Sequence, residues 1–311
     1  MRKRTLATTL GLLCAFAATA CSAPGADRAG ARDFVALSPA GPVANSATPP
    51  AVAEPTAPPT AAPPGASHAA ALSAARDKVR SAQTCRGEIT VYIGETKIST
   101  SQIQLRMGGA PFARLVTTTE AAYFQSLGQP VPPEEDRRTE TIVTPTSVYS
   151  SNGPEVSQLY NGKAWTMTTL AARDGNGGQP QDFASQLALL KRSGDVREVG
   201  TEMVDGVQAT HYSGTISLAL LYQNTAESTG MSEKEYAMLR QLWEALRFEN
   251  VQIELWVGPD GLPVKQTTIT TTKSSGSPVA SITSTTRYLA WGVPIDESLP
   301  PAEDTMKLQL P

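Results

Sequence analysis

The sequence predicts an α+β fold in which helices pack on one face of a large antiparallel sheet. Three observations support this. Runs of alternating apolar and polar residues fill most of the chain after residue 87, and short turn segments separate them. Three other stretches carry apolar residues at helical spacing. Strands that follow one another through short turns pair antiparallel, so the helices must cover a face of the resulting sheet.

The folded part begins with a predicted helix over 68–83, where Leu72, Ala75, Val79 and Ala82 recur at helical spacing. Three strands follow, each recognised by alternation of apolar and polar residues. Their apolar positions are Ile89, Val91 and Ile93 in the first strand, Ile103, Leu105 and Met107 in the second, and the run 112–119 in the third.

Residues 121–138 interrupt the strands with a proline-rich segment that predicts a loop. Its acidic run at 134–136 lies beside two arginines, which is more typical of a solvated turn than of paired catalytic carboxylates. Strands resume at 139–144, 147–150 and 158–169. Within the last of these, Asn161-Gly162 predicts a type I′ hairpin turn.

The second half repeats the alternation of helices and strands. A glycine-rich turn at 174–178 lacks the bidentate Glu of a calcium loop, because Ser185 stands at the twelfth position. A short helix is predicted from Pro180 to Gly194, and strands at 196–204 and 208–216 flank a turn at Asp205-Gly206.

A capping box at Ser232-Glu233-Lys234-Glu235 starts the most clearly marked helix of the chain, over 232–247. Its apolar side consists of Leu239, Leu242, Trp243 and Leu246. The last strands follow this helix. They are predicted over 251–257, where Val251, Ile253 and Leu255 share one face, and over 263–273 and 279–291.

Residues 1–20 predict an export signal, because a basic start is followed by an apolar run too short to span a bilayer as a helix. The signal ends in Ala18-Thr19-Ala20-Cys21, which resembles the lipobox of bacterial lipoproteins. The family more often has Leu where Ala18 stands. The resemblance implies that Cys21 receives a diacylglyceryl thioether and an N-acyl chain such as palmitate, which would hold the protein on the extracytoplasmic face of the membrane. Ordinary secretion with cleavage after the same run is the alternative.

Residues 21–67 form a predicted tether between Cys21 and the folded part. Ten of the 24 prolines lie between Pro24 and Pro64, and few charged or aromatic residues accompany them. Such a composition buries too little apolar surface to offset chain entropy, so we expect an extended segment. The domain boundaries are therefore a signal peptide over 1–20, a lipidated tether over 21–67 and one domain over 68–311.

Composition argues against several classes of function. The chain has 26 Lys+Arg against 29 Asp+Glu, so it lacks the basic excess of a nucleic-acid binder. Two His and three Cys are few for a zinc or iron site. Cys85 has no neighbouring His and is read as a small buried side chain, and His211 is assigned a structural role. Because no catalytic motif appears either, we expect no enzyme activity, no catalytic residue, no cofactor and no metal.

Three short motifs carry a resemblance to a known family. They are Tyr160-Asn161-Gly162-Lys163-Ala164-Trp165, Val204-Asp205-Gly206-Val207 running into Thr210-His211-Tyr212, and the stretch from Glu254 to Pro263. Together with the order of elements they resemble the LolA-like superfamily, and within it the LppX/LprG-type lipoproteins of high-GC Gram-positive envelopes. The resemblance implies a strongly curved sheet, a half-barrel, whose concave face is covered by helices around an apolar cavity for acyl chains.

The resemblance therefore implies a monomeric, lipid-anchored envelope protein that binds or carries a lipid or a lipoprotein acyl group. The candidate cavity residues are the apolar strand positions and the apolar side of the 232–247 helix. They are Ile89, Val91, Ile93, Ile103, Leu105, Met107, Leu239, Leu242, Trp243, Leu246, Val251, Ile253 and Leu255. Such stripes also occur in any half-buried sheet. The alternative is a sensor or assembly module of the same fold that binds a protein partner through an external patch.

Overall fold

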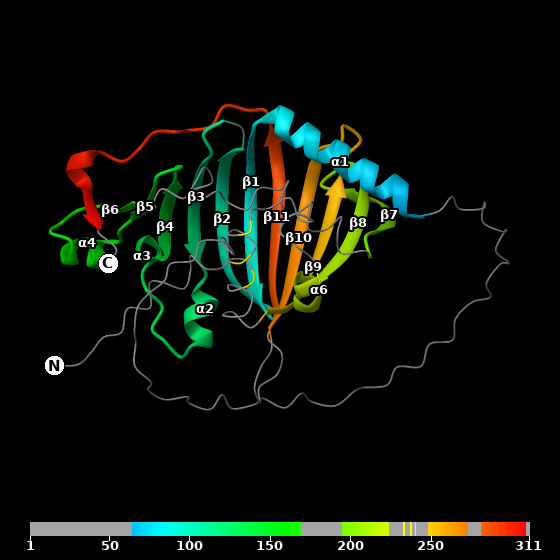
Figure 1. Ribbon diagram of the computed structural model, residues 1–311. Helices are drawn as coiled ribbons and strands as arrows, with labels where there is room; N and C mark the ends of the chain where they lie inside the picture. Colours follow the sequence, from blue (N-terminus) through cyan, green and yellow to red (C-terminus); the bar gives the residue numbers. More distant parts are fainter. Residues whose placement is uncertain are drawn as a thin grey trace, which may run out of the picture.

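The computed structural model describes residues 64–107, 109–169, 195–223, 233, 237, 240, 248–272 and 281–308. In these ranges the strands form one twelve-stranded sheet (Figure 1). Helix α1 lies at one end of the strands, and α2 and α6 lie at the other (Figure 1). The predicted α+β class with a large antiparallel sheet is confirmed.

The bounds of the elements follow the chain. The strands are β1 (Thr84–Ile93), β2 (Thr96–Arg106), β3 (Phe112–Thr119), β4 (Arg138–Val143), β5 (Ser147–Ser151), β6 (Trp165–Thr169), β7 (Arg197–Val204), β8 (Val207–Ser217), β9 (Phe248–Val257), β10 (Pro263–Thr272), β11 (Ser281–Trp291) and β12 (Thr305–Leu308). The helices are α1 (Pro64–Ala82), α2 (Ala121–Ser126), α3 (Glu134–Arg137), α4 (Pro154–Leu159), α6 (Leu218–Gln223) and the 3-10 turn η1 (Ala302–Asp304).

The sheet consists of two meanders that meet in its middle. Strands β1 to β6 pair in sequence order, as do β7 to β11, and every one of these pairs is antiparallel. The two halves are joined by β1 and β11, whose antiparallel register places Cys85 opposite Trp291. The outermost strands of the sheet are β12 and β7. The first of these differs from the rest, because β12 pairs with β6 in parallel.

Helix α1 forms where the sequence places small and apolar residues on one stripe. Leu72, Ala75 and Val79 are buried completely or nearly so, as the helical spacing predicted. The helix begins at Pro64, four residues before the predicted start of the folded part. After its last residue, Gln83 takes a positive φ of 61° and donates its N–H to the Val79 carbonyl at 3.2 Å. This left-handed residue turns the chain directly into β1.

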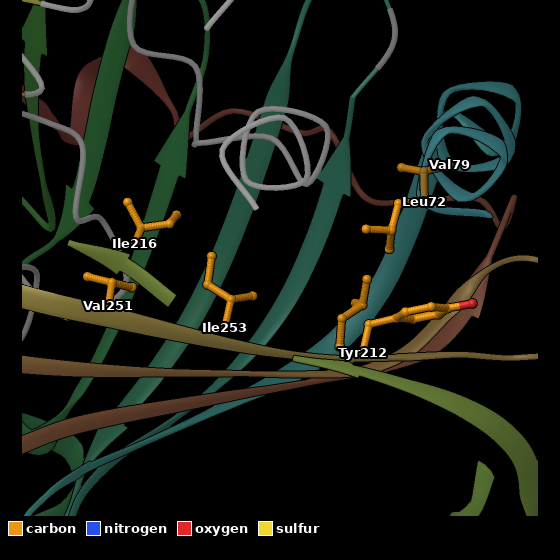
Figure 2. Close-up of a cluster of buried hydrophobic side chains, with 7 residues drawn as sticks. Leu72, Val79, Tyr212, Ile216, Val251 and Ile253 are labelled. Atoms are coloured by element: carbon orange, nitrogen blue, oxygen red, sulfur yellow. The ribbon is translucent and has the colours of Figure 1, made fainter. Parts of the chain in front are cut away.

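The core lies on the face of the sheet against which α1 packs, here called the inner face. Figure 2 shows the sheet bending toward α1, so that this face is the concave one. Leu72 and Val79 of the helix pack there with a set of side chains from β8 and β9, here called the α1 cluster. Those strand residues are Tyr212, Ile216, Val251, Ile253 and Leu255. Each fully buried aliphatic side chain contributes about 1.5–3 kcal/mol, so the α1 cluster fixes the helix on the sheet.

The C-terminal segment returns along the strand ends on the same side as α1 (Figure 1). Arg114 on β3 contacts both Glu140 at 2.6 Å and Asp296 of this segment at 3.2 Å. Arg106 on β2 contacts Glu297 at 2.6 Å. These ion pairs hold the segment against the ends of β2 and β3. The segment then continues into β12, which pairs with β6. Neither the segment nor the parallel strand was predicted from the sequence.

The predicted strand over 158–169 is wrong in its first half. Pro154 stands in the first turn of α4, which occupies 154–159, and the strand β6 starts only at Trp165. Asn161 and Gly162 do take positive φ values of 56° and 77°. They end α4 instead of turning a hairpin, because the Gly162 N–H donates to the Ser157 carbonyl at 2.9 Å.

Other differences are local. The predicted loop over 121–138 contains the short helices α2 and α3, and α6 follows β8 at a place where no helix was predicted. The two-residue turn at Asp205-Gly206 is confirmed, with φ values of 50° and 84° between paired Val204 and Val207. The predicted helix over 180–194 lies outside the described residues. So does most of the 232–247 helix, of which Glu233, Ala237 and Arg240 are described as helical.

Candidate functional site

The inner face carries several of the apolar side chains that are predicted from the sequence to line a ligand cavity. Strand register places Ile89 and Val91 of β1 on this face together with Ile103 and Leu105 of β2. Val251, Ile253 and Leu255 of β9 lie on the same face within the α1 cluster. These seven candidates come from three strands, and the register brings them to one side of the sheet.

A second group of apolar residues, here called the β2–β4 cluster, lies on the inner face beyond β1. Its buried members are Ile103, Ala113, Leu115 and Val143. Ile89, Leu105 and Val148 pack against them in partly buried positions. Ile103 is 3% exposed and Val91 of the adjacent β1 is 1% exposed. The inner face thus carries two apolar clusters, one on β8 and β9 and the other on β1 to β5.

The remaining candidates are placed differently. Ile93 ends β1 and is 36% exposed. Met107 follows β2, packs against the α1 cluster and donates its N–H to the Gln83 carbonyl at 2.7 Å. Leu239, Leu242, Trp243 and Leu246 lie outside the described residues, as does Cys21 with its signal and tether. Among the helices of the described ranges, none combines the length and the hydropathy needed to cross a membrane.

Polar side chains occupy the inner face of β10 and β11, between the two apolar clusters. Gln266 lies opposite Thr286, and Thr268 lies opposite Ser284. We call these four residues the hydroxyl band. The threonine content of these strands predicts a pleated sheet but does not reveal the band. Both faces of β10 carry threonines, so the alternation that separates apolar from polar faces gives no signal there.

The end of the hydroxyl band nearest α1 is closed by two stacked aromatic rings. Tyr288 and Trp291 stack with their centroids 5.0 Å apart, and Trp291 Nε1 donates to the Pro263 carbonyl at 2.8 Å. The Tyr288 hydroxyl donates to Gln266 Oε1 at 3.3 Å. Burial, with a smaller contribution from nearby Cys85, raises the pKa of Tyr288 above its usual value. The phenol is therefore neutral at physiological pH and serves as a hydrogen-bond donor.

Cys85 is a buried structural residue, as predicted. Its side chain has no exposed surface at the start of β1, and burial raises the pKa of its thiol to about 12. A thiol reacts as the thiolate, so Cys85 is unreactive at neutral pH.

The outer face of the sheet carries a compact polar cluster around His211. Its Nδ1 lies 3.2 Å from Glu202 Oε1 on β7, and its Nε2 contacts Glu254 on β9. Ser213 Oγ donates to Glu254 at 2.8 Å, and Trp256 Nε1 donates to Glu202. These contacts connect three adjacent strands. Sequence reasoning missed the two carboxylates, because strand pairing alone brings them to His211.

This outer cluster does not form a metal centre. In the described ranges, no three His, Cys, Asp or Glu residues are arranged to hold a metal ion. The contacts of His211 agree with the structural role that the sequence analysis gave it.

No family model matches the chain. A curated relative, an uncharacterized 31.2 kDa protein from the rplA-rplJ intergenic region of Streptomyces griseus, is 29% identical over 168 residues. The matched part is 51% of this chain and 52% of the relative, so the chain spans about half the length of the curated relative it matches.

The chain is also similar to several solved structures at low sequence identity. LprF from Mycobacterium bovis has a TM-score of 0.41 at 13% identity, over 76% of this chain and 98% of that one. The lipoprotein LppX from Mycobacterium tuberculosis has a TM-score of 0.39 at 13% identity, over 75% and 98%. A LolA superfamily protein from Nitrosomonas europaea has a TM-score of 0.25 at 12% identity, over 77% and 96%. The solved structures similar to this chain include the lipoprotein LppX and a LolA superfamily protein, which are the kinds of protein that the sequence motifs resemble.

Proposed function

We propose that this chain is a lipid-anchored, extracytoplasmic protein that binds the acyl chains of a lipid against the inner face of its sheet, without covalent chemistry. The observation that carries the proposal is the composition of this face. Two apolar clusters, on β8–β9 and on β1–β5, lie on the concave side of one curved sheet. A concave apolar surface with few polar groups is the usual form of a site for an apolar ligand.

The N-terminal sequence supports the cellular setting of this proposal. An export signal over 1–20, a lipidated Cys21 and a proline-rich tether over 21–67 would hold the domain near the membrane that supplies its ligand. A Cys21→Ser variant tests the anchor by itself. We expect this variant to lose membrane association and the mass of the attached lipid, and unchanged association and mass would contradict the anchor.

Native mass spectrometry of the full chain purified from its own envelope tests the ligand. We expect a species heavier than the lipidated chain by one lipid, which collisional activation releases and organic extraction recovers in stoichiometric amount. A mass equal to that of the lipidated chain alone, with no lipid in the extract, would contradict the proposal.

A protein-binding module is the second candidate, and β7, an outermost strand of the sheet in the described ranges, favours it. Val199 and Met203 on the edge strand β7 are 53% and 66% exposed, and Val207 lies nearby on β8. Exposed apolar groups beside an unpaired strand edge are suited to contact with another protein. Absence of bound lipid, together with loss of a specific envelope partner in a Val199→Ser, Met203→Ser variant, would favour this alternative.

A further inference from the structure

We infer that the hydroxyl band recognises the ester carbonyl groups in the middle of a two-chain lipid, whose chains lie beside the apolar positions that border the band. The inference rests on the proposed lipid-binding function and adds the chemical class of the ligand and the residues that select it. The band consists of Gln266 and Thr268 on β10 and of Ser284 and Thr286 on β11.

Strand register gives the inner face an ordered pattern at this place. One row across the sheet reads Leu255, Gln266, Thr286, Ile89, and the next row reads Ile253, Thr268, Ser284, Val91. Each row is therefore apolar, polar, polar, apolar over β9, β10, β11 and β1. Because directly opposite side chains on one face are close neighbours, the four polar residues form a single block with an apolar border on both sides.

The hydroxyls of the band are available to a ligand. Gln266 Nε2 donates to Thr268 Oγ1 over a long 3.4 Å contact. The hydroxyls of Ser284 and Thr286 make no hydrogen bond to any other part of the chain that the structure describes. The outer face of the same strands differs, because Thr267 and Thr285 are bonded to each other through their hydroxyls at 3.1 Å.

This pattern fits one kind of apolar ligand better than others. A single hydrocarbon chain laid across the rows would cover the Ser284 and Thr286 hydroxyls without bonding them, which is unfavourable for buried polar groups. A glycerolipid carries two ester carbonyls between its two chains. Those carbonyls can accept hydrogen bonds from Ser284, Thr286 and Thr268, while the chains extend from the band toward partly buried apolar positions beside it, such as Ile89.

A competition between two lipids that differ in the ester groups alone tests the inference. The full chain is incubated with equimolar dipalmitoylglycerol and its diether analogue dihexadecylglycerol, and the two complexes are counted by native mass spectrometry. Ether oxygens accept hydrogen bonds weakly, so we expect the diester complex to exceed the diether complex about twofold to tenfold for each hydrogen bond made.

Variants on the two faces locate the effect. We expect Thr268→Val with Ser284→Ala to lower the ratio of the two complexes by about twofold to tenfold for each hydrogen bond lost, while total bound lipid is maintained. The matched outer-face pair Thr267→Val with Thr285→Val should keep the wild-type ratio. Equal binding of the two lipids by the wild type, or an unchanged ratio in the inner-face variant, overturns the inference and leaves lipid binding intact. Failure of the wild type to bind either lipid overturns the proposed function itself.

Discussion

His211 lies flat against Trp256 on the outer face of the sheet, with ring centroids 4.3 Å apart and an angle of 14° between the rings. Lys265 covers the Trp256 ring as well, with Nζ 4.1 Å from the ring centroid. With Glu202 and Glu254 on its two nitrogens, His211 joins the edge strand β7 to β9 across β8. The contacts of His211 therefore attach β7, the edge strand that carries the exposed Val199 and Met203, to the rest of the sheet.

The first prediction concerns this connection. His211→Phe keeps an aromatic ring on Trp256 but removes both nitrogen atoms, which leaves the 13%-exposed Glu254 side chain without that partner. We expect the free energy of unfolding, measured in urea at pH 7, to fall by about 1–3 kcal/mol. The more exposed pair between Lys97 and Glu120 is the control, and Lys97→Gln should cost at most about 1 kcal/mol. Equal effects of the two substitutions would contradict the prediction.

The second prediction concerns the attachment of α1. Leu72 is completely buried between the helix and the sheet, so Leu72→Ala should lower the free energy of unfolding by about 2–5 kcal/mol. Lys78 lies exposed on the same helix, and Lys78→Ala should be nearly neutral. Chemical denaturation monitored by tryptophan fluorescence compares them. A neutral Leu72→Ala would mean that α1 does not contribute to the core.

The third prediction tests the inner face as a lipid site. Ile89 on the inner face and Val116 on the outer face are both half-buried and β-branched, so substitution by Thr introduces a hydroxyl and keeps the branched Cβ at both positions, and at Ile89 it also removes one methyl group. We expect Ile89→Thr to reduce copurified lipid severalfold, and Val116→Thr to leave it unchanged. Phosphate and fatty-acid analysis of the extract measures this. A similar loss in both variants would indicate general destabilisation instead of a defined site.

The fourth prediction concerns alkaline pH. Because burial raises the pKa of Cys85 to about 12, from an ordinary value of 9.0, the unfolded chain loses this proton at lower pH than the folded chain does. The stabilisation is complete below pH 9 and is lost as the pH rises toward 12, by up to about 4 kcal/mol. Tyr288 acts in the same direction. Cys85→Ala should make the decline shallower between pH 9 and 11, and an unchanged slope would contradict the assignment.

The fifth prediction concerns acid pH at the C-terminal segment. Hydrogen bonds from the Ser298 backbone and side chain lower the pKa of Asp296, with a smaller contribution from Arg114. A lowered pKa stabilises the folded state above the ordinary value of 3.8 and ceases to do so as the pH falls through the folded value. Hydrogen exchange over 305–308 should therefore be faster in Asp296→Asn than in the wild type at pH 6. The two should converge only well below pH 3.8, once Asp296 is protonated in the folded state, and a difference that persists in that protonated state would exclude the charge as the cause.

Sequence periodicity predicted the parts of the fold in which one face is apolar and the other polar. The stripe of α1 and the alternation around Ile89, Ile103 and Ile253 were read correctly, because burial on one face imposes those patterns. The turn at Asp205-Gly206 was also read correctly, since its positive φ values need such residues.

The remaining features depend on contacts between distant parts of the chain. The Asn161-Gly162 signal marks two positive φ values, but it could not tell a helix end from a hairpin. The carboxylates around His211 and the hydroxyl band on β10 and β11 arise from strand register across the sheet. The parallel β12 has too few residues to give a periodic signal, and its place is set by distant ion pairs such as Arg106 with Glu297.

The pairing of β1 with β11 also sets the order of events during biosynthesis. Each half of the sheet can form from neighbouring segments, but the halves cannot join until Trp291 has been synthesised and can reach Cys85. Pairing between segments so far apart in the chain forms slowly. The twelve-stranded sheet is therefore completed only after the C-terminal strands have been made.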